Sequence, residues 1–136
     1  MRTLLLGLAV SLAMIGSAAA DTAGKVVGAM MYADWCSSCK VLDPKVQALE
    51  TRLEKIGVTV VKLDYTARSK QALLAQADAA GIEDAVSEWT DAKVKTGQLL
   101  LIDVDAGRVI GVVTMSFDKG QVLAAAQSAT SAVKGL

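Results

Sequence analysis

The 136-residue chain contains no histidine, two cysteines and a single proline, Pro44. Without histidine it lacks the commonest metal-ligating side chain and cannot form a cysteine–histidine nucleophile pair. Two cysteines are too few for a closed zinc site within one chain, so we expect no metal site. The 14 basic and 14 acidic residues balance to a formal net charge of zero. The overall charge therefore points neither to nucleic acid nor to an acidic partner.

The first 20 residues have the pattern of a secretory signal peptide. Arg2 gives the charged start, residues 4–15 form an apolar run that is short for a membrane span, and Ala18-Ala19-Ala20 fits the small-x-small pattern of a cleavage site. We expect a signal peptide at residues 1–20 and one domain at residues 21–136. An uncleaved N-terminal anchor is the alternative. Either reading predicts export, which in a bacterium means the periplasm, where disulfides persist.

Both cysteines lie in the motif Trp35-Cys36-Ser37-Ser38-Cys39-Lys40. The apolar run before it, residues 25–32, is typical of a buried strand. The pattern after it predicts a helix at residues 36–56, with Cys39 on the apolar stripe. The motif therefore places a Cys-x-x-Cys pair where a strand leads into a helix.

This placement favours redox chemistry over a structural disulfide. Backbone N–H groups and the helix dipole at a helix N-terminus favour a thiolate, and nearby cations do the same. Lys40 in the first turn either assists in this way or is simply solvated. We expect Cys36 at an exposed lip as the attacking thiol and Cys39 on the buried face as the resolving thiol. A bridge across so small a loop would add little stability, which disfavours a purely structural role.

The rest of the chain predicts an α/β fold with a mixed central sheet. The expected elements are a strand at residues 58–64, a helix capped by Thr66 and ending near Ala80, a short helix at 82–89, strands at 98–104 and 108–114, and a last helix capped by Asp118. The first two strands should be parallel with a right-handed crossover, and the last two should form an antiparallel hairpin. Helices should cover both faces of the sheet.

The segment Ala33-Asp34-Trp35-Cys36-Ser37-Ser38-Cys39-Lys40 resembles the active site of the thioredoxin superfamily. Pro44 matches the proline inside the following helix of that family. Residues 58–64 resemble its central strand, residues 98–113 its final hairpin, and residues 118–122 the start of its last helix. The resemblance implies a thioredoxin-like fold, without the first strand and helix of full-length thioredoxin.

The resemblance also implies roles for other residues near the cysteines. Trp35 matches the tryptophan that flanks the family's active site, or it packs in the core. Lys62 matches a lysine beneath that site, or it is a solvated lysine at the sheet edge. Thr96, Gly97 and Gln98 occupy the place of the substrate-facing loop. Because that loop has no proline here, we expect a trans peptide in place of the family's cis-proline.

The sequence departs from the family at the position of a buried acid, and the roles of the methionines and of Trp89 have two readings each. Met30 stands where the family has a buried acid that assists proton transfer from the second cysteine, and Asp34 and Asp64 are the candidate replacements. Met30 and Met31 are expected in the core rather than as copper ligands. We expect Trp89 to be a core anchor rather than part of a substrate groove.

We interpret the chain as an exported, monomeric thiol–disulfide oxidoreductase that works without a bound cofactor. The Ser37-Ser38 pair between the cysteines contains no histidine to stabilise a thiolate strongly, which favours a reductant. As a periplasmic reductant it would take electrons from a membrane-embedded donor and reduce a disulfide in a client protein. Two alternatives stay open: a module in which the two thiolates hold Cu(I), a soft ion, and a redox-inactive interaction domain.

Overall fold

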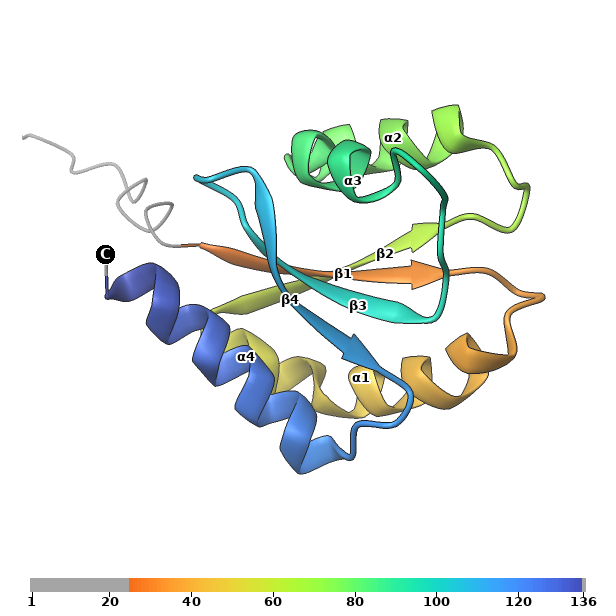
Figure 1. Ribbon diagram of the computed structural model, residues 1–136. Helices are drawn as coiled ribbons and strands as arrows, with labels where there is room; N and C mark the ends of the chain where they lie inside the picture. The colour runs from red at the N-terminus through yellow and green to blue at the C-terminus, as the bar shows by residue number, and fades with distance from the viewer. Residues whose placement is uncertain (1–24, 136) are drawn as a thin grey trace, which may run out of the picture.

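The computed structural model describes residues 25–135 (Figure 1). Within these residues the elements in chain order are β1 (Val26–Tyr32), α1 (Ser37–Lys55), β2 (Val58–Asp64), α2 (Lys70–Ala79), α3 (Glu83–Trp89), β3 (Gln98–Asp103), β4 (Arg108–Thr114) and α4 (Lys119–Lys134). None of these helices is long and apolar enough to cross a membrane. The predicted signal peptide and the predicted loss of the first thioredoxin strand and helix concern the N-terminal segment, which lies outside the described residues.

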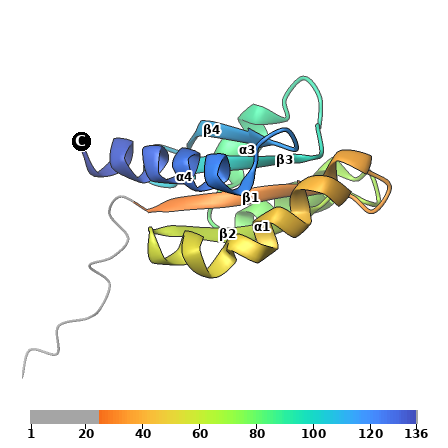
Figure 2. The ribbon, with the colours of Figure 1, turned by 90° about the horizontal axis from the view of Figure 1, so that it is seen from below.

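The four strands form one mixed sheet in the order β2-β1-β3-β4. β1 runs parallel to β2 and antiparallel to β3, and β3 pairs antiparallel with β4. Helices α1 and α4 cover one face, and α2 and α3 cover the other, as Figures 1 and 2 show. This arrangement confirms the predicted α/β fold, with its parallel first pair and antiparallel hairpin.

The central strand β1 is apolar throughout because both of its faces are covered. Val26 and Met30 belong to the core beneath α1 and α4, whereas Val27, Ala29 and Met31 belong to the core beneath α2 and α3. Full burial of each large apolar side chain stabilises the fold by about 1.5–3 kcal/mol. The prediction that both methionines lie in the core is confirmed. A rigid β1 fixes the position of the loop that follows it, which leads directly to Cys36.

Several local predictions agree closely with the structure. β2 and β4 begin and end at the predicted residues. Asp118 caps α4 as expected: its Oδ1 accepts a hydrogen bond from the Gln121 N–H at 2.8 Å. The Gln121 side chain completes a capping box by accepting from the Asp118 N–H at 2.9 Å.

Two local predictions were wrong. Thr66 does not cap α2; the cap is Ser69, whose Oγ accepts a hydrogen bond from the Ala72 N–H at 3.1 Å. Both residues are good helix caps, and Thr66 is instead engaged by the loop that carries the cysteines. Trp89 is not a core anchor, since it is the last residue of α3 and 39% exposed.

Candidate active site

Cys36 and Cys39 form a disulfide at the N-terminus of α1. Cys36 is the N-cap residue, and its Sγ accepts a hydrogen bond from the Cys39 N–H at 3.2 Å. Cys39 is fully buried, as predicted, but Cys36 is only 7% exposed, so the predicted exposed lip was wrong. The Cys36 sulfur is covered because Gly97, in the loop that precedes β3, packs against it.

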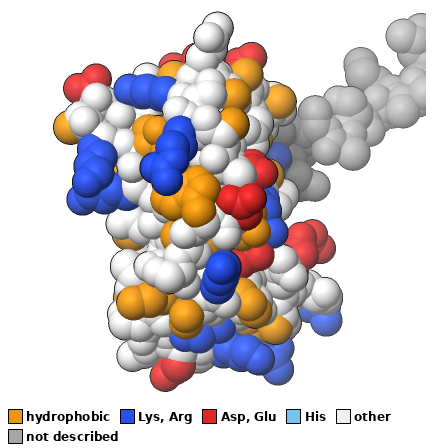
Figure 3. Space-filling model, turned by 90° about the vertical axis from the view of Figure 1, so that its right-hand side faces the viewer, with side chains coloured by type: hydrophobic (Ala, Val, Ile, Leu, Met, Phe, Trp, Pro, Cys, Tyr) orange, Lys and Arg blue, Asp and Glu red, His pale blue; other side chains and the backbone are white. Residues whose placement is uncertain are grey.

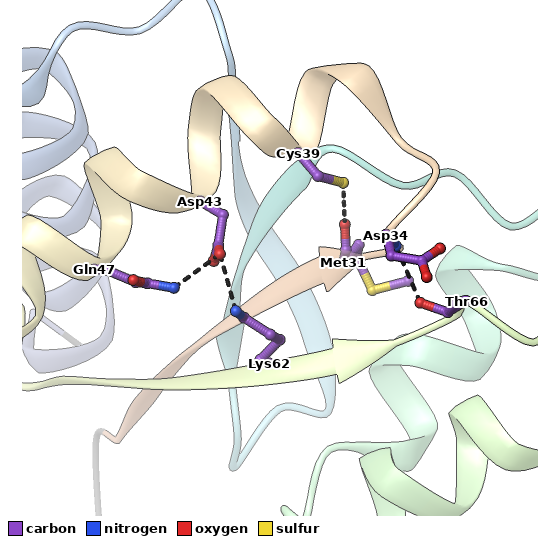
Figure 4. A network of polar contacts seen from close by, with 7 residues as sticks. All are labelled: Met31, Asp34, Cys39, Asp43, Gln47, Lys62 and Thr66. Carbon is purple, nitrogen blue, oxygen red and sulfur yellow. Dashed lines mark hydrogen bonds and ion pairs between the residues drawn. The ribbon is translucent and has the colours of Figure 1, made fainter.

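The two sulfurs have opposite surroundings, which Figure 4 shows for Cys39. Cys39 Sγ lies 3.4 Å from the carbonyl oxygen of Met31. In the reduced protein this carbonyl can accept a hydrogen bond from the Cys39 thiol, which favours the protonated form. A backbone N–H that points at the Cys36 sulfur favours the thiolate instead. The two sulfurs therefore differ in their hydrogen-bonding partners: a backbone N–H faces Cys36 Sγ, and a backbone carbonyl faces Cys39 Sγ.

The covering loop meets the cysteines at Gly97. Its N–H donates a hydrogen bond to the Met31 carbonyl at 2.8 Å, the same oxygen that faces Cys39. Gly97 has φ +81°, and a Cβ on it would lie 2.5 Å from Ser38 Cβ and 3.4 Å from Cys36 Sγ. All peptide bonds of residues 25–135 are trans, as expected for this loop. Only glycine fits here, on grounds of both backbone conformation and space.

Thr96 and Gln98, on either side of Gly97, are half-buried. They line one open groove together with Trp35. Gln98 Oε1 accepts a hydrogen bond from Trp89 Nε1 at 3.3 Å. The three predicted loop residues therefore lie against the disulfide and beside the groove next to it.

Thr66 holds the loop that precedes Cys36. The Asp34 N–H donates to Thr66 Oγ1 at 3.0 Å, and Trp35 Nε1 donates to the Thr66 carbonyl at 3.0 Å. Trp35 remains 42% exposed, so it is not a core residue. Thr66 is 31 and 32 residues away from these donors. Sequence reasoning assigned it to a helix cap, and nothing local could have revealed this contact.

Neither of the two acids predicted as replacements takes a buried position. Asp34 and Asp64 are both exposed. Hydrogen bonds from Thr66, first from its side chain and then from its backbone, lower the pKa of Asp64 below its ordinary value. Asp64 therefore stabilises the loop after β2 as a carboxylate rather than serving as a buried acid.

The buried carboxylate near the cysteines is Asp43, which sequence reasoning missed. It lies one helical turn after Cys39 on the same face of α1, and it is 9% exposed. Figure 4 shows Asp43 Oδ2 between two donors, Lys62 Nζ at 2.9 Å and Gln47 Nε2 at 2.8 Å. Its place within the apolar stripe of the helix was the signal that could have identified it.

Lys62 is partly exposed and contacts both Asp43 and Tyr32. Its side chain is 41% exposed and forms an ion pair with Asp43, and its ammonium group lies 4.5 Å from the centre of the Tyr32 ring. Lys40, in contrast, is exposed, and no hydrogen bond or ion pair joins its ammonium group to any residue of 25–135. The two predicted supporting lysines therefore differ in their surroundings.

Asp43 lies beside an open pocket. A pocket of about 440 Å³ between α1 and β2 is lined by Asp43, Lys62 and Met30, among others. In the part of the chain that the structure describes, no group of three or more histidine, cysteine, aspartate or glutamate side chains is placed to hold a metal ion. The arrangement suits proton transfer and sulfur exchange.

Comparisons with known proteins agree with the fold. Residues 18–82 match the sequence model of the family described as Thioredoxin. A stretch of 45 residues is 42% identical to a Schizosaccharomyces pombe protein named as a putative protein disulfide-isomerase; the match covers 33% of this chain and 9% of that protein. The fold also resembles a thioredoxin-family thiol:disulfide interchange protein from Chlorobium tepidum, with a TM-score of 0.54 and 18% identity over 82% of this chain and 83% of that one.

Proposed function

We propose that the protein is a thiol–disulfide oxidoreductase that exchanges disulfides with client proteins through Cys36 and Cys39. The match of residues 18–82 to the Thioredoxin family model supports this proposal. The observation that supports this most is the unequal environment of the two sulfurs. The Cys39 N–H points at Cys36 Sγ, and the Met31 carbonyl points at Cys39 Sγ. Cys36 is thus suited to be the attacking thiolate, and Cys39 is suited to remain protonated until it resolves the mixed disulfide.

The exchange proceeds in two steps that balance in atoms and electrons. The Cys36 thiolate attacks one sulfur of a client disulfide, which forms a mixed disulfide and releases the other client sulfur as a thiolate. Cys39 then loses its proton and attacks Cys36 Sγ, which releases the second client thiolate and closes the Cys36–Cys39 bond. Two electrons pass to the client, and the protein must be reduced again by a donor.

Asp43 is the group that we assign to the proton of Cys39. The buried carboxylate lies one turn along α1 from Cys39, a spacing that places the two Cβ atoms roughly 5–6 Å apart. The pocket that Asp43 lines gives water a route to this side chain. Lys62 holds the carboxylate in position through its ion pair. Asp43 thus takes from the helix the role that the family's strand acid has at the position of Met30.

We place the protein in the periplasm, as a monomeric reductant supplied by a membrane-embedded donor. The signal-peptide pattern of residues 1–20 supports export. Ser37 and Ser38 add no positive charge between the cysteines, and within residues 25–135 the Lys40 ammonium group forms no hydrogen bond or ion pair that would fix its charge beside them. Weak stabilisation of the thiolate favours a reducing pair over a strongly oxidising one.

Trapping of the mixed disulfide tests the proposal. The Cys39→Ser variant cannot resolve the intermediate, so it should retain a client through Cys36 in the cells that make the protein. The Cys36→Ser variant should trap nothing, because Cys39 is fully buried. Trapping by neither variant, or equal trapping by both, would contradict exchange initiated by Cys36. Non-reducing gels, run before and after addition of dithiothreitol, give the readout.

A further inference from the structure

An open groove of about 600 Å³ lies beside the disulfide. Its lining includes Trp35, Arg68, Lys93, Lys95 and Gln98, and no aspartate or glutamate. Figure 3 views the end of the molecule that carries this site; basic side chains lie there beside exposed apolar ones, and acidic side chains lie on the same face. The groove therefore combines an apolar wall with a positive rim.

The three cations of this rim are available to a ligand. Arg68, Lys93 and Lys95 are exposed, and within residues 25–135 none of them forms an ion pair; the pair between Lys62 and Asp43 lies elsewhere. The Arg68 guanidinium lies 4.0 Å from the centre of the Trp35 ring, which holds it over the groove. Arg68 is thus held over the groove, and within residues 25–135 none of the three cations is paired with a carboxylate.

The rim is placed to act together with the reactive sulfur. Trp35 directly precedes Cys36, and Lys95 lies two residues before Gly97, which packs against Cys36 Sγ. Two residues of extended chain span at most about 7 Å. A protein segment whose disulfide is presented to Cys36 would therefore bring its neighbouring side chains to these cations.

We propose that this groove receives client segments that carry Asp or Glu within about two to four residues of the reactive cysteine. The inference rests on the proposed exchange activity and adds a substrate class to it. A protein segment fits better than another polyanion, because the adjoining sulfur needs a disulfide partner. The formal net charge of zero hides this feature, since the cations come from two segments that the fold brings together.

Paired peptides test the proposal on the full-length reduced protein. Each peptide has one internal disulfide; the two differ only in three Asp or Glu residues beside one cysteine, which are Asn or Gln in the second. The second-order rate constant for oxidation of the protein is measured with each peptide at low and high salt. We expect the acidic peptide to react roughly three- to tenfold faster at low salt, with a smaller advantage at high salt.

Matched variants show whether the groove is responsible. Lys93→Gln/Lys95→Gln should bring the ratio of the two rates close to one, because it slows the reaction of the acidic peptide more than that of the amide peptide. Lys55→Gln/Lys134→Gln changes the net charge equally at the ends of α1 and α4 and should leave the ratio intact. Equal rates for both peptides in the unmodified protein, or an equal loss in the two variants, would overturn the acidic preference alone. Failure of the protein to exchange with either peptide or with dithiothreitol would overturn the proposed function as well.

Discussion

Replacement of Gly97 by alanine probes how tightly the covering loop fits the disulfide. At φ +81° an alanine incurs about 1–2 kcal/mol of backbone strain, partly offset by about 0.4–1 kcal/mol from a less flexible unfolded chain. The new Cβ would also lie 2.5 Å from Ser38 Cβ. Since Ser38 Cβ cannot rotate away, the loop or the helix must shift, at a cost of about 1–3 kcal/mol. We expect Gly97→Ala to destabilise the fold by about 2–4 kcal/mol in total.

Gly81→Ala is the matched control. Gly81 has a similar φ of +75°, but a Cβ there would have no atom within 4 Å, so it should cost only the net strain of about 1 kcal/mol or less. Urea denaturation of both oxidised variants gives the two free energies of unfolding. Gly97→Ala should also slow reduction by dithiothreitol, because the methyl group would lie 3.4 Å from Cys36 Sγ. A difference between the variants below about 0.5 kcal/mol would refute the claim of close packing.

Three further predictions concern the polar groups around the site. Asp43→Asn should slow resolution of the mixed disulfide about tenfold or more, measured by rapid acid quenching, whereas an unchanged rate would remove Asp43 from the mechanism. Thr66→Val should lower the free energy of unfolding by about 1 kcal/mol, measured in urea, because the Asp34 N–H loses its acceptor; no change would show that water replaces the contact. The folded-state pKa of Asp64 is lowered below 3.8, so the stability that this carboxylate contributes is present above that pH and is lost as the pH falls through the folded-state pKa. In acid denaturation the difference in stability between the protein and Asp64→Asn should therefore shrink as the pH falls. A difference that stays constant with pH would contradict this prediction.

The sequence predicted the elements best where local pattern and packing agree. β2 is rich in β-branched residues and β1 is continuously apolar, so both strands were found within one residue of their observed ends. The start of α2 was predicted three residues too early because Thr66 and Ser69 are both good helix-capping residues. Only the fold decides between them, since it assigns Thr66 to the loop of Asp34.

The Cys-x-x-Cys motif, the burial of Cys39 and the loop at Gly97 were predictable, but the buried Asp43 and its ion pair were not. The partner of Asp43 is Lys62, 19 residues later on a strand, so the motif alone could not show the ion pair. The burial of Cys36 depends on Gly97, which is distant in sequence and reaches the sulfur only because β3 pairs with β1. The same pairing of β3 with β1 brings Lys93 and Lys95, in the loop before β3, to the groove beside Trp35. Sequence patterns identify such residues singly, but the topology determines which of them meet.

The reduction potential of the Cys36–Cys39 pair tests the central claim most directly. The oxidised protein is equilibrated against dithiothreitol or glutathione buffers, and the thiol content is measured by alkylation. A value near about −270 mV, comparable to that of thioredoxin, is the result that a client-reducing dithiol predicts. A value near about −120 mV would reverse the direction of exchange, and a pair that fails to equilibrate would contradict exchange altogether.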